Sequence, residues 1–462
     1  MLEAAHSLVG AIHLVHYQKH GYDPPRIWKL TPFQNLRRNF AKAVMETYAV
    51  SALNFAGLMI NTNALGVLLF GQLIVIQSLT ELFSGIFSFN TWQSLNRFGA
   101  DDLEKGNYSK LRQRYFFALG LDFLAACTAA ICAIVAFLFF IEVFGLDSEL
   151  RWLGVVYGFS VAFHARSASV GIFRLLERFG IPIMFTVTEA AALAINAAVL
   201  WWIDAPLEYY VYSIAFIQVF TSVTLSACGL IMVGRMEKRG GYNEDKSFPK
   251  REFLRFAFAV SATGTVGIML RKGEVLLISM LLGPAAAGLF GVAFRGAYFF
   301  ARFADAGNVS VYPIIAKMAV SGEVAKAKDI VMRATLPVVG VALVMFTAAI
   351  LGGRPALEII FGDEFGAAYP NLLWLAAGTL TNACFFAVIP LIDIVLGATR
   401  TFVFSIISFV SFLVASIVGL SVFGLPAGGV GTAAYFATLA LLAIWQVRKL
   451  PLIKAPANSP VH

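Results

Sequence analysis

Long hydrophobic runs alternate with short polar breaks along almost the whole chain. Runs long enough to cross a ~30 Å hydrocarbon core lie at 39–60, 64–90, 115–144, 152–174, 181–203 and 208–234. A charged break at 235–252 follows, and six more runs lie at 253–282, 285–315, 329–352, 367–396, 401–423 and 426–447. The pattern predicts an all-α polytopic membrane protein with twelve transmembrane helices in two sets of six.

The polar breaks divide the chain into five predicted segments. They are an N-terminal cytoplasmic or interfacial segment at 1–37, a first lobe at 38–235, a cytoplasmic linker at 236–252, a second lobe at 253–447 and a cytoplasmic tail at 448–462. Near the N-terminus, His6, His13, His16 and His20 fall near one face if 5–20 is helical. A metal site and a loose interfacial helix are both open for that segment.

Composition agrees with a membrane protein, since 59% of the residues are hydrophobic and only 13% are charged. The net charge of +8 could indicate nucleic acid, but the distribution of the basic residues argues otherwise. Of the 35 lysines and arginines, the predicted outside loops hold only Arg151 and Arg354. Under the positive-inside rule both termini are cytoplasmic, and the basic residues set membrane orientation.

The hairpin formed by 253–282 and 285–315 carries most of the intramembrane charge. A tight turn is predicted at Gly283-Pro284, and the charged residues of the hairpin are Arg271, Lys272, Glu274, Arg295, Arg302 and Asp305. Each charge at the bilayer centre costs at least ~2.5–3.5 kcal/mol, so these groups should face protein, one another or water. They predict a polar cavity open to an anionic or amphiphilic solute. For Arg271 and Glu274, which share a helix face, an ion pair that locks the hairpin is the alternative.

The first half has its own polar groups within predicted spans. Carboxylates occur at Glu81, Asp122 and Glu189, and Arg166 lies near the middle of the fourth span. A lone carboxylate in a membrane is a candidate for proton or sodium coupling, and a structural hydrogen-bonded carboxylate is the alternative. The four cysteines fall in apolar runs and are expected to be packing residues.

Motifs for enzymatic chemistry do not occur. The outside loops are short, and the sequence contains no Gly-rich phosphate loop, metal-ligand cluster or nucleophile elbow. We therefore expect no enzymatic activity, no cofactor and no resident metal.

Four stretches resemble the polysaccharide flippases of the MOP superfamily, the Wzx-like polysaccharide biosynthesis membrane proteins. They are FNTWQSLNRFGADDLEKGNYSKLRQRY, VLLISMLLGPAAAGLFGVAFR, SVYPIIAKMAVSGEVAKAKDIVMRATLPVVG and LEIIFGDEFGAAYPNLLWLAAG. The resemblance covers roughly 38–447 and implies two six-helix lobes that form a V around a central cavity. It implies a flippase of a bacterial inner membrane that moves a polyprenyl-diphosphate-linked oligosaccharide to the outer leaflet by alternating access.

The resemblance also suggests roles for the charged residues. Candidates for contact with the diphosphate are Arg166, Arg271, Lys272, Arg295 and Arg302, because arginine binds phosphate oxygens and stays charged. Candidates for a coupling ion, H⁺ or Na⁺, are Glu81, Asp122 and Glu189. The expected partners are the lipid-linked oligosaccharide, membrane lipids, a polysaccharide polymerase and glycosyltransferases.

Three other functions compete with this prediction. A cation-coupled multidrug exporter of the same superfamily should have a more acidic cavity, and a peptidoglycan-precursor flippase usually has fourteen spans. A membrane-embedded glycan polymerase or ligase should carry a large external loop. The arginine excess, the predicted span number and the short outside loops each argue against one of these alternatives.

Overall fold

The computed structural model describes residues 32–237, 248–298, 318, 324–396 and 398–449. Within these ranges all regular structure is helical and there is no β-strand. The main helices are α2 (Pro32–Phe87), α3 (Thr91–Glu104), α4 (Tyr108–Phe140), α5 (Arg151–Ser160), α6 (Ser167–Leu175), α7 (Gly180–Trp202), α8 (Leu207–Glu237), α9 (Lys250–Leu282), residues 284–298, α11 (Val324–Phe361), α12 (Tyr369–Cys384), α13 (Val388–Leu396), α14 (Ala398–Phe423) and α15 (Val430–Lys449).

Eight helical stretches in the described ranges are long and apolar enough to cross a membrane. This number is consistent with the twelve predicted spans for three reasons. The stretch Thr47–Glu104 contains two predicted spans, which meet at a kink where Gly66 has φ 66° and ψ −178°. The spans predicted at 152–174 and 367–396 are each broken into two short helices. The span predicted at 285–315 is described only to residue 298.

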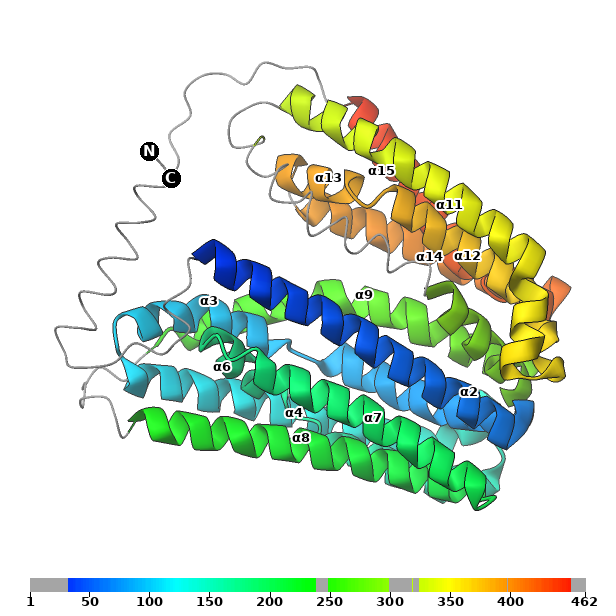
Figure 1. Ribbon diagram of the computed structural model, residues 1–462, viewed down its shortest axis with the longest axis horizontal. Coiled ribbons are helices and arrows are strands. Elements are labelled where there is room, and N and C mark those ends of the chain that lie inside the picture. Colours follow the sequence, from blue (N-terminus) through cyan, green and yellow to red (C-terminus); the bar gives the residue numbers. More distant parts are fainter. Residues whose placement is uncertain (1–31, 238–247, 299–317, 319–323, 397, 450–462) are drawn as a thin grey trace.

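The helices form two groups that converge at one end and diverge toward the other, as Figure 1 shows. Helices α2 to α8 make one group and α11 to α15 make the other. Helix α9 packs against α2 and α3 as well as against α14 and α15, so it lies between the groups. The arrangement is the predicted V. The exact division into lobes and linker stays a prediction, because part of the linker lies outside the described residues.

Aromatic contacts close the convergent end. The ring centroids of Phe55 and Phe361 are 5.7 Å apart, and those of Phe70 and Phe365 are 6.2 Å apart, both edge to face. The Asn63 side-chain amide also donates to the Ile360 carbonyl oxygen at 3.3 Å. Edge-to-face pairs stabilise such a contact beyond the apolar area that they bury. These contacts join α2 to the end of α11 and the turn that follows it.

Close packing of α2 on the hairpin turn depends on a glycine. A Cβ atom at Gly71 would lie 1.9 Å from the Pro284 carbonyl oxygen, so no larger residue fits there. The segment 284–298 therefore runs directly along α2, and the Thr379 hydroxyl of α12 donates to the Ala297 carbonyl oxygen at 3.5 Å on its other side. The hairpin thus sits between the two helix groups.

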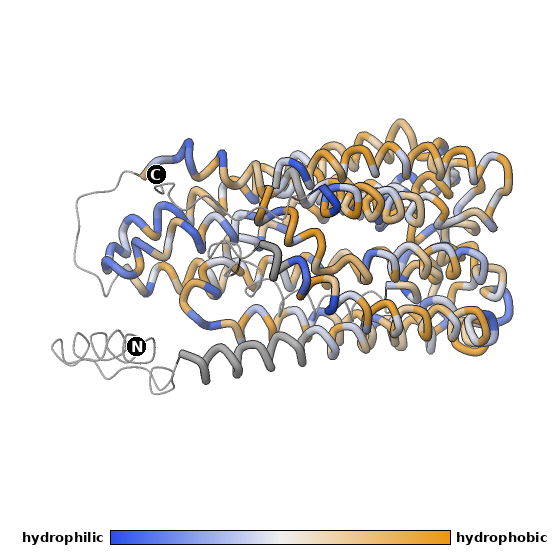
Figure 2. Tube along the Cα trace, turned by 90° about the horizontal axis from the view of Figure 1, so that it is seen from above, coloured by the Kyte–Doolittle hydropathy of each residue, from blue (hydrophilic) through white to orange (hydrophobic). Residues whose placement is uncertain are grey.

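Small residues also allow close helix packing along α4. Its buried face is dominated by alanines, at 118, 125, 126, 129, 130, 133 and 136. In lipid, where apolar helices gain little from leaving the solvent, small residues allow the close contact that holds helices together. Figure 2 shows hydrophobic residues along most of the helical length and hydrophilic residues gathered toward one end.

Candidate functional site

The Gly283 turn is where the sequence predicts it. Helix α9 ends at Leu282, and Gly283 has φ 87°, a value that favours glycine. The turn folds 284–298 back beside α9 and brings Arg295 to the level of Arg271 and Lys272. These three cations, together with Gln77 of α2, line a pocket of about 30 Å³. A water molecule needs ~10–15 Å³, so the pocket is of water size.

One of these cations is neutralised by an acid of the first half. The Lys272 ammonium lies 2.5 Å from Glu81 Oε2, and the two side chains are 27% and 48% exposed. The charge of Glu81 also acts on His164, Tyr157 and Arg295. Glu81 is therefore the point at which α2, α5, α9 and segment 284–298 interact electrostatically.

Within the described ranges, the other two cations form no ion pair of this kind. Among the described residues, neither Arg271 nor Arg295 forms an ion pair with a carboxylate. The Arg271 side chain lies along its own helix, where its Nη1 would be 3.4 Å from a Cβ at Gly267. The Arg295 side chain is exposed. Arg302 and Asp305 lie outside the described residues, so their predicted roles stay predictions.

The alternative left open for Arg271 and Glu274, an ion pair that locks the hairpin, is wrong. Glu274 is only 1% exposed and faces α15, where its carboxylate accepts from the Gly429 N–H at 3.2 Å and from the Thr432 hydroxyl at 2.5 Å. Spacing puts both side chains near one face, but they point toward different neighbours. Glu274 therefore joins α9 to α15 and leaves the Arg271 charge uncompensated.

Arg166 and Glu189, predicted for different roles, contact each other. Arg166 Nη1 lies 2.5 Å from Glu189 Oε2, and the side chains are 42% and 13% exposed. Arg166 follows the break between α5 and α6, where the Ala165 carbonyl oxygen accepts from the Ser226 hydroxyl at 2.8 Å. Beside it, His164 Nε2 is buried without a hydrogen-bond partner among the described residues.

Asp122 has a structural position. Its buried carboxylate accepts from the Thr91 hydroxyl at 2.7 Å and from the Ala168 N–H at 2.6 Å. Thr91 opens α3 and Ala168 lies in the first turn of α6. The first N–H groups of a helix lack partners within it, and a carboxylate satisfies them well. Asp122 thus fastens the starts of two helices to α4.

The four cysteines are all among the described residues, and they agree with the expectation that they are packing residues. All four cysteines are free and partly buried among the helices, as packing residues would be. No group of three histidine, cysteine, aspartate or glutamate residues in the described ranges could hold a metal ion. The histidines of the N-terminal segment lie outside those ranges.

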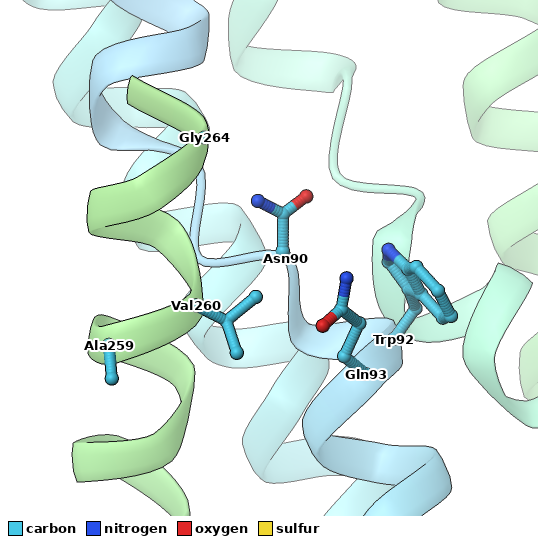
Figure 3. Close-up of a pocket in the computed structure, with 6 residues that line it drawn as sticks. All are labelled: Asn90, Trp92, Gln93, Ala259, Val260 and Gly264. Atoms are coloured by element: carbon cyan, nitrogen blue, oxygen red, sulfur yellow. The ribbon is translucent and has the colours of Figure 1, made fainter. Parts of the chain in front are cut away.

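A second cleft was not predicted from the sequence. Asn90, Trp92 and Gln93, at the junction of α2 and α3, face Ala259, Val260 and Gly264 of α9 across a space of about 500 Å³ (Figure 3). Asn90 has φ 43° and ψ 43°, so the chain turns sharply there. The only signal in the sequence is a polar Asn-Thr pair at the end of an apolar run.

The sequence also matches a known protein family. The family described as polysaccharide biosynthesis protein matches residues 36–319, more than half of the chain. The chain belongs to that family. The match includes the first six predicted spans, the linker and the charged hairpin. The predicted resemblance is therefore confirmed.

Individual proteins are also similar to this chain in sequence or in structure. Inner membrane protein YghQ of Escherichia coli (strain K12) is 24% identical over 313 residues, which cover 65% of this chain and 85% of that protein. An inward-facing multidrug resistance MATE family transporter of the MOP superfamily has a TM-score of 0.63 at 14% identity, covering 87% of this chain and 93% of its own. The lipid II flippase MurJ, in an inward closed conformation, has a TM-score of 0.63 at 13% identity, covering 88% of both chains.

The family match and these structural likenesses establish the family and the fold. This member of the polysaccharide biosynthesis family has the all-helical MOP-superfamily fold. The sequence relative is described as an inner membrane protein, and the two proteins of similar structure are described as a transporter and a flippase. The specific cargo, the coupling ion, the orientation of the termini and the absence of enzymatic activity stay predictions.

Proposed function

We propose that this protein is a flippase that moves a polyprenyl-diphosphate-linked oligosaccharide, a precursor of a cell-surface polysaccharide, from the cytoplasmic to the outer leaflet. The observation that carries the proposal is the pair Arg271 and Arg295, which line one pocket without an acidic partner among the described residues. Two uncompensated cations within a membrane are costly. An anionic group that enters beside them removes that cost.

A diphosphate suits these side chains. Bare charge cannot cross the hydrocarbon core, because burying an unpaired ion is prohibitive. Arginine stays charged and offers a planar fork of donors to phosphate oxygens. Since the pocket of about 30 Å³ has room only for water, the diphosphate would bind at its mouth, where Arg295 is exposed. Arg302 is a further candidate, while Arg166 is a weaker one because Glu189 already compensates its charge.

The V suggests how the cargo moves. Given cytoplasmic termini, the end closed by Phe70 and Phe365 is the outer end and the divergent end faces the cytoplasm. The cargo would enter between the lobes 38–235 and 253–447, with its lipid in the bilayer and its sugars in the cleft. Rocking of the lobes would then open the outer end.

The Glu81–Lys272 pair offers a way to couple an ion to this motion. A proton or Na⁺ on Glu81 would release the Lys272 ammonium, which could then join Arg271 and Arg295 at the diphosphate. Glu189 and Asp122 are weaker coupling candidates, because Arg166 and two helix starts already occupy them. A polymerase and glycosyltransferases would act on the same glycan before and after it crosses.

Lipid mass spectrometry on cells that lack the protein tests the proposal. We expect a polyprenyl-diphosphate oligosaccharide to accumulate while surface glycan falls, and re-expression of the intact protein should reverse both changes. Unchanged lipid intermediates together with greater sensitivity to cationic compounds would instead indicate a multidrug exporter.

A separate experiment tests the orientation in the membrane. Cysteines introduced at 147 and 204 should be labelled from outside, and one at 106 only after permeabilisation.

A further inference from the structure

The cleft between the α2–α3 junction and α9 lies apart from the cation pocket. At 1.5 Å per residue, Gly264 is about 10 Å from Arg271 along α9, toward the divergent end. Its volume of about 500 Å³ is within the range of small-molecule sites. The cation pocket is far smaller, so the larger part of an entering solute would have to lie on this side.

The described lining of the cleft is largely apolar, carries no charge and includes two amide side chains. Asn90, Gln93 and Trp92 face three small or apolar residues of α9, and none of the six carries a charge. Such a lining does not compensate a phosphate or a cation. Amide donors and acceptors beside apolar surface suit a neutral solute that has both hydroxyl groups and apolar faces, as a sugar does.

The amide groups are available to such a solute. Asn90 precedes the first turn of α3, but its side chain makes no capping hydrogen bond. In the described part of the chain, neither the Asn90 nor the Gln93 side chain has a hydrogen-bond partner, and Figure 3 shows both on the side toward α9. Each amide supplies two donors and an acceptor that can alternate with sugar hydroxyls.

The rest of the cleft is held in place. The Arg174 guanidinium lies 4.4 Å from the Trp92 ring, and the Trp92 N–H of the backbone donates to the Ser167 hydroxyl at 3.2 Å. On α9, a Cβ at Gly264 would lie 3.6 Å from Asn90 Nδ2. Gly264 therefore keeps the space beside the Asn90 amide open.

We propose that Asn90, Gln93 and the open space at Gly264 form a subsite for neutral sugar residues of the lipid-linked glycan, about 10 Å from the cations that bind its diphosphate. The inference rests on the proposed function and assigns different parts of the lipid to different groups of residues. The cations bind the part common to all such lipids, and the amide cleft binds the glycan that differs among them.

Binding measurements with two lipids separate the two parts. The first probe is the lipid-linked oligosaccharide extracted from cells that lack the protein, and the second is undecaprenyl diphosphate, which has no sugar. Purified protein in nanodiscs should bind the first about tenfold more tightly than the second. The variant Asn90→Ala/Gln93→Ala should remove this difference and leave the affinity for undecaprenyl diphosphate unchanged, since two neutral hydrogen bonds amount to about tenfold.

A pair of glycine variants supplies the control. Gly264→Leu should fill the cleft and weaken only the glycan-bearing probe. Gly340→Leu adds the same bulk on α11, where a Cβ meets nothing within 4 Å, and should weaken neither. Equal loss for both probes in Asn90→Ala/Gln93→Ala, or no loss for either, would overturn the subsite. If the intact protein does not bind undecaprenyl diphosphate at all, the proposed function fails first, and the subsite with it.

Discussion

Arg166 and Arg295 lie in opposite halves of the chain, and both are arginines within predicted spans. Arg166 has Glu189 at 2.5 Å, whereas Arg295 has no acidic partner among the described residues. Placing an arginine in the membrane costs free energy in either case. Glu189 offsets that cost for Arg166, whereas no described carboxylate pairs with Arg295 in the hairpin. The partner of a charge, more than its presence, therefore indicates where a ligand binds.

Removal of the two arginines that have no ion-pair partner among the described residues should have the largest effect on transport. Arg271→Ala/Arg295→Ala should lower transport at least ~100-fold, because each lost charge-assisted hydrogen bond to phosphate is worth about 1.5–3 kcal/mol. Accumulated lipid-linked oligosaccharide measures the loss. Size-exclusion chromatography in detergent should show folded protein, since these side chains stabilise no described carboxylate. Arg271→Lys/Arg295→Lys is the matched control and should keep part of the activity. Loss of the folded protein would show that the cations are structural.

Removal of the buried Glu274 carboxylate should, in contrast, lower the stability of the protein and leave the transport activity of the folded molecules in place. Glu274→Ala leaves the Thr432 hydroxyl and the Gly429 N–H without their acceptor, and should lower stability by about 2–4 kcal/mol. Thermal unfolding in detergent measures this, and transport should fall only as far as the amount of folded protein falls. Glu274→Gln, which keeps one oxygen, should cost less.

A double-mutant cycle then tests the correction to the predicted pair. Glu274→Gln and Arg271→Gln should add within about 0.5 kcal/mol, as sites without a shared interaction do. Strong coupling between them would restore the ion pair that the structure replaces.

The compensated arginine should give an intermediate effect. Arg166→Gln and Glu189→Gln should each destabilise the protein, and their double-mutant cycle should show a coupling of about 1–2 kcal/mol. Exchange of the two residues, Arg166→Glu/Glu189→Arg, is expected to recover part of the loss. A coupling near zero would place Arg166 with the unpaired cations and return it to the list of strong diphosphate contacts.

The smallest effect on stability should come from the Glu81–Lys272 pair. Lys272→Gln or Glu81→Gln should change the free energy of unfolding by less than about 1 kcal/mol, since both side chains are partly exposed and such ion pairs contribute little. Thermal unfolding beside Glu274→Ala gives the comparison. If Glu81 couples an ion, its variant should also flatten the dependence of transport on pH or Na⁺ while leaving stability in place.

Sequence length and hydropathy were enough to predict the spans, because each hydrophobic run reports directly on the bilayer. The Gly283 turn was predictable as well, since glycine and proline mark it locally. The breaks within spans were not. The break before α6 is stabilised by Ser226 and Asp122, which come from other helices. No local pattern around residues 161–166 reports those contacts.

The charged residues were likewise predictable only in part. Their presence in the membrane follows from the sequence, and so does the inference that they avoid lipid. Their partners depend on which helices meet: Glu274 turns to Thr432 on α15, and Glu81 reaches Lys272 on α9. The Asn90 cleft depends likewise on where α9 crosses the α2–α3 junction. Such tertiary pairings are not encoded by spacing within one helix.

Asp122 has a mechanical consequence. Broken helices are natural places for bending, and α3 and α6 both begin at breaks. One carboxylate on α4 ties both starts together, so the two segments cannot swing separately. Motion at the divergent end of this group of helices is therefore expected to move α3 and α6 together, while bending takes place at joints elsewhere, such as the Gly66 kink.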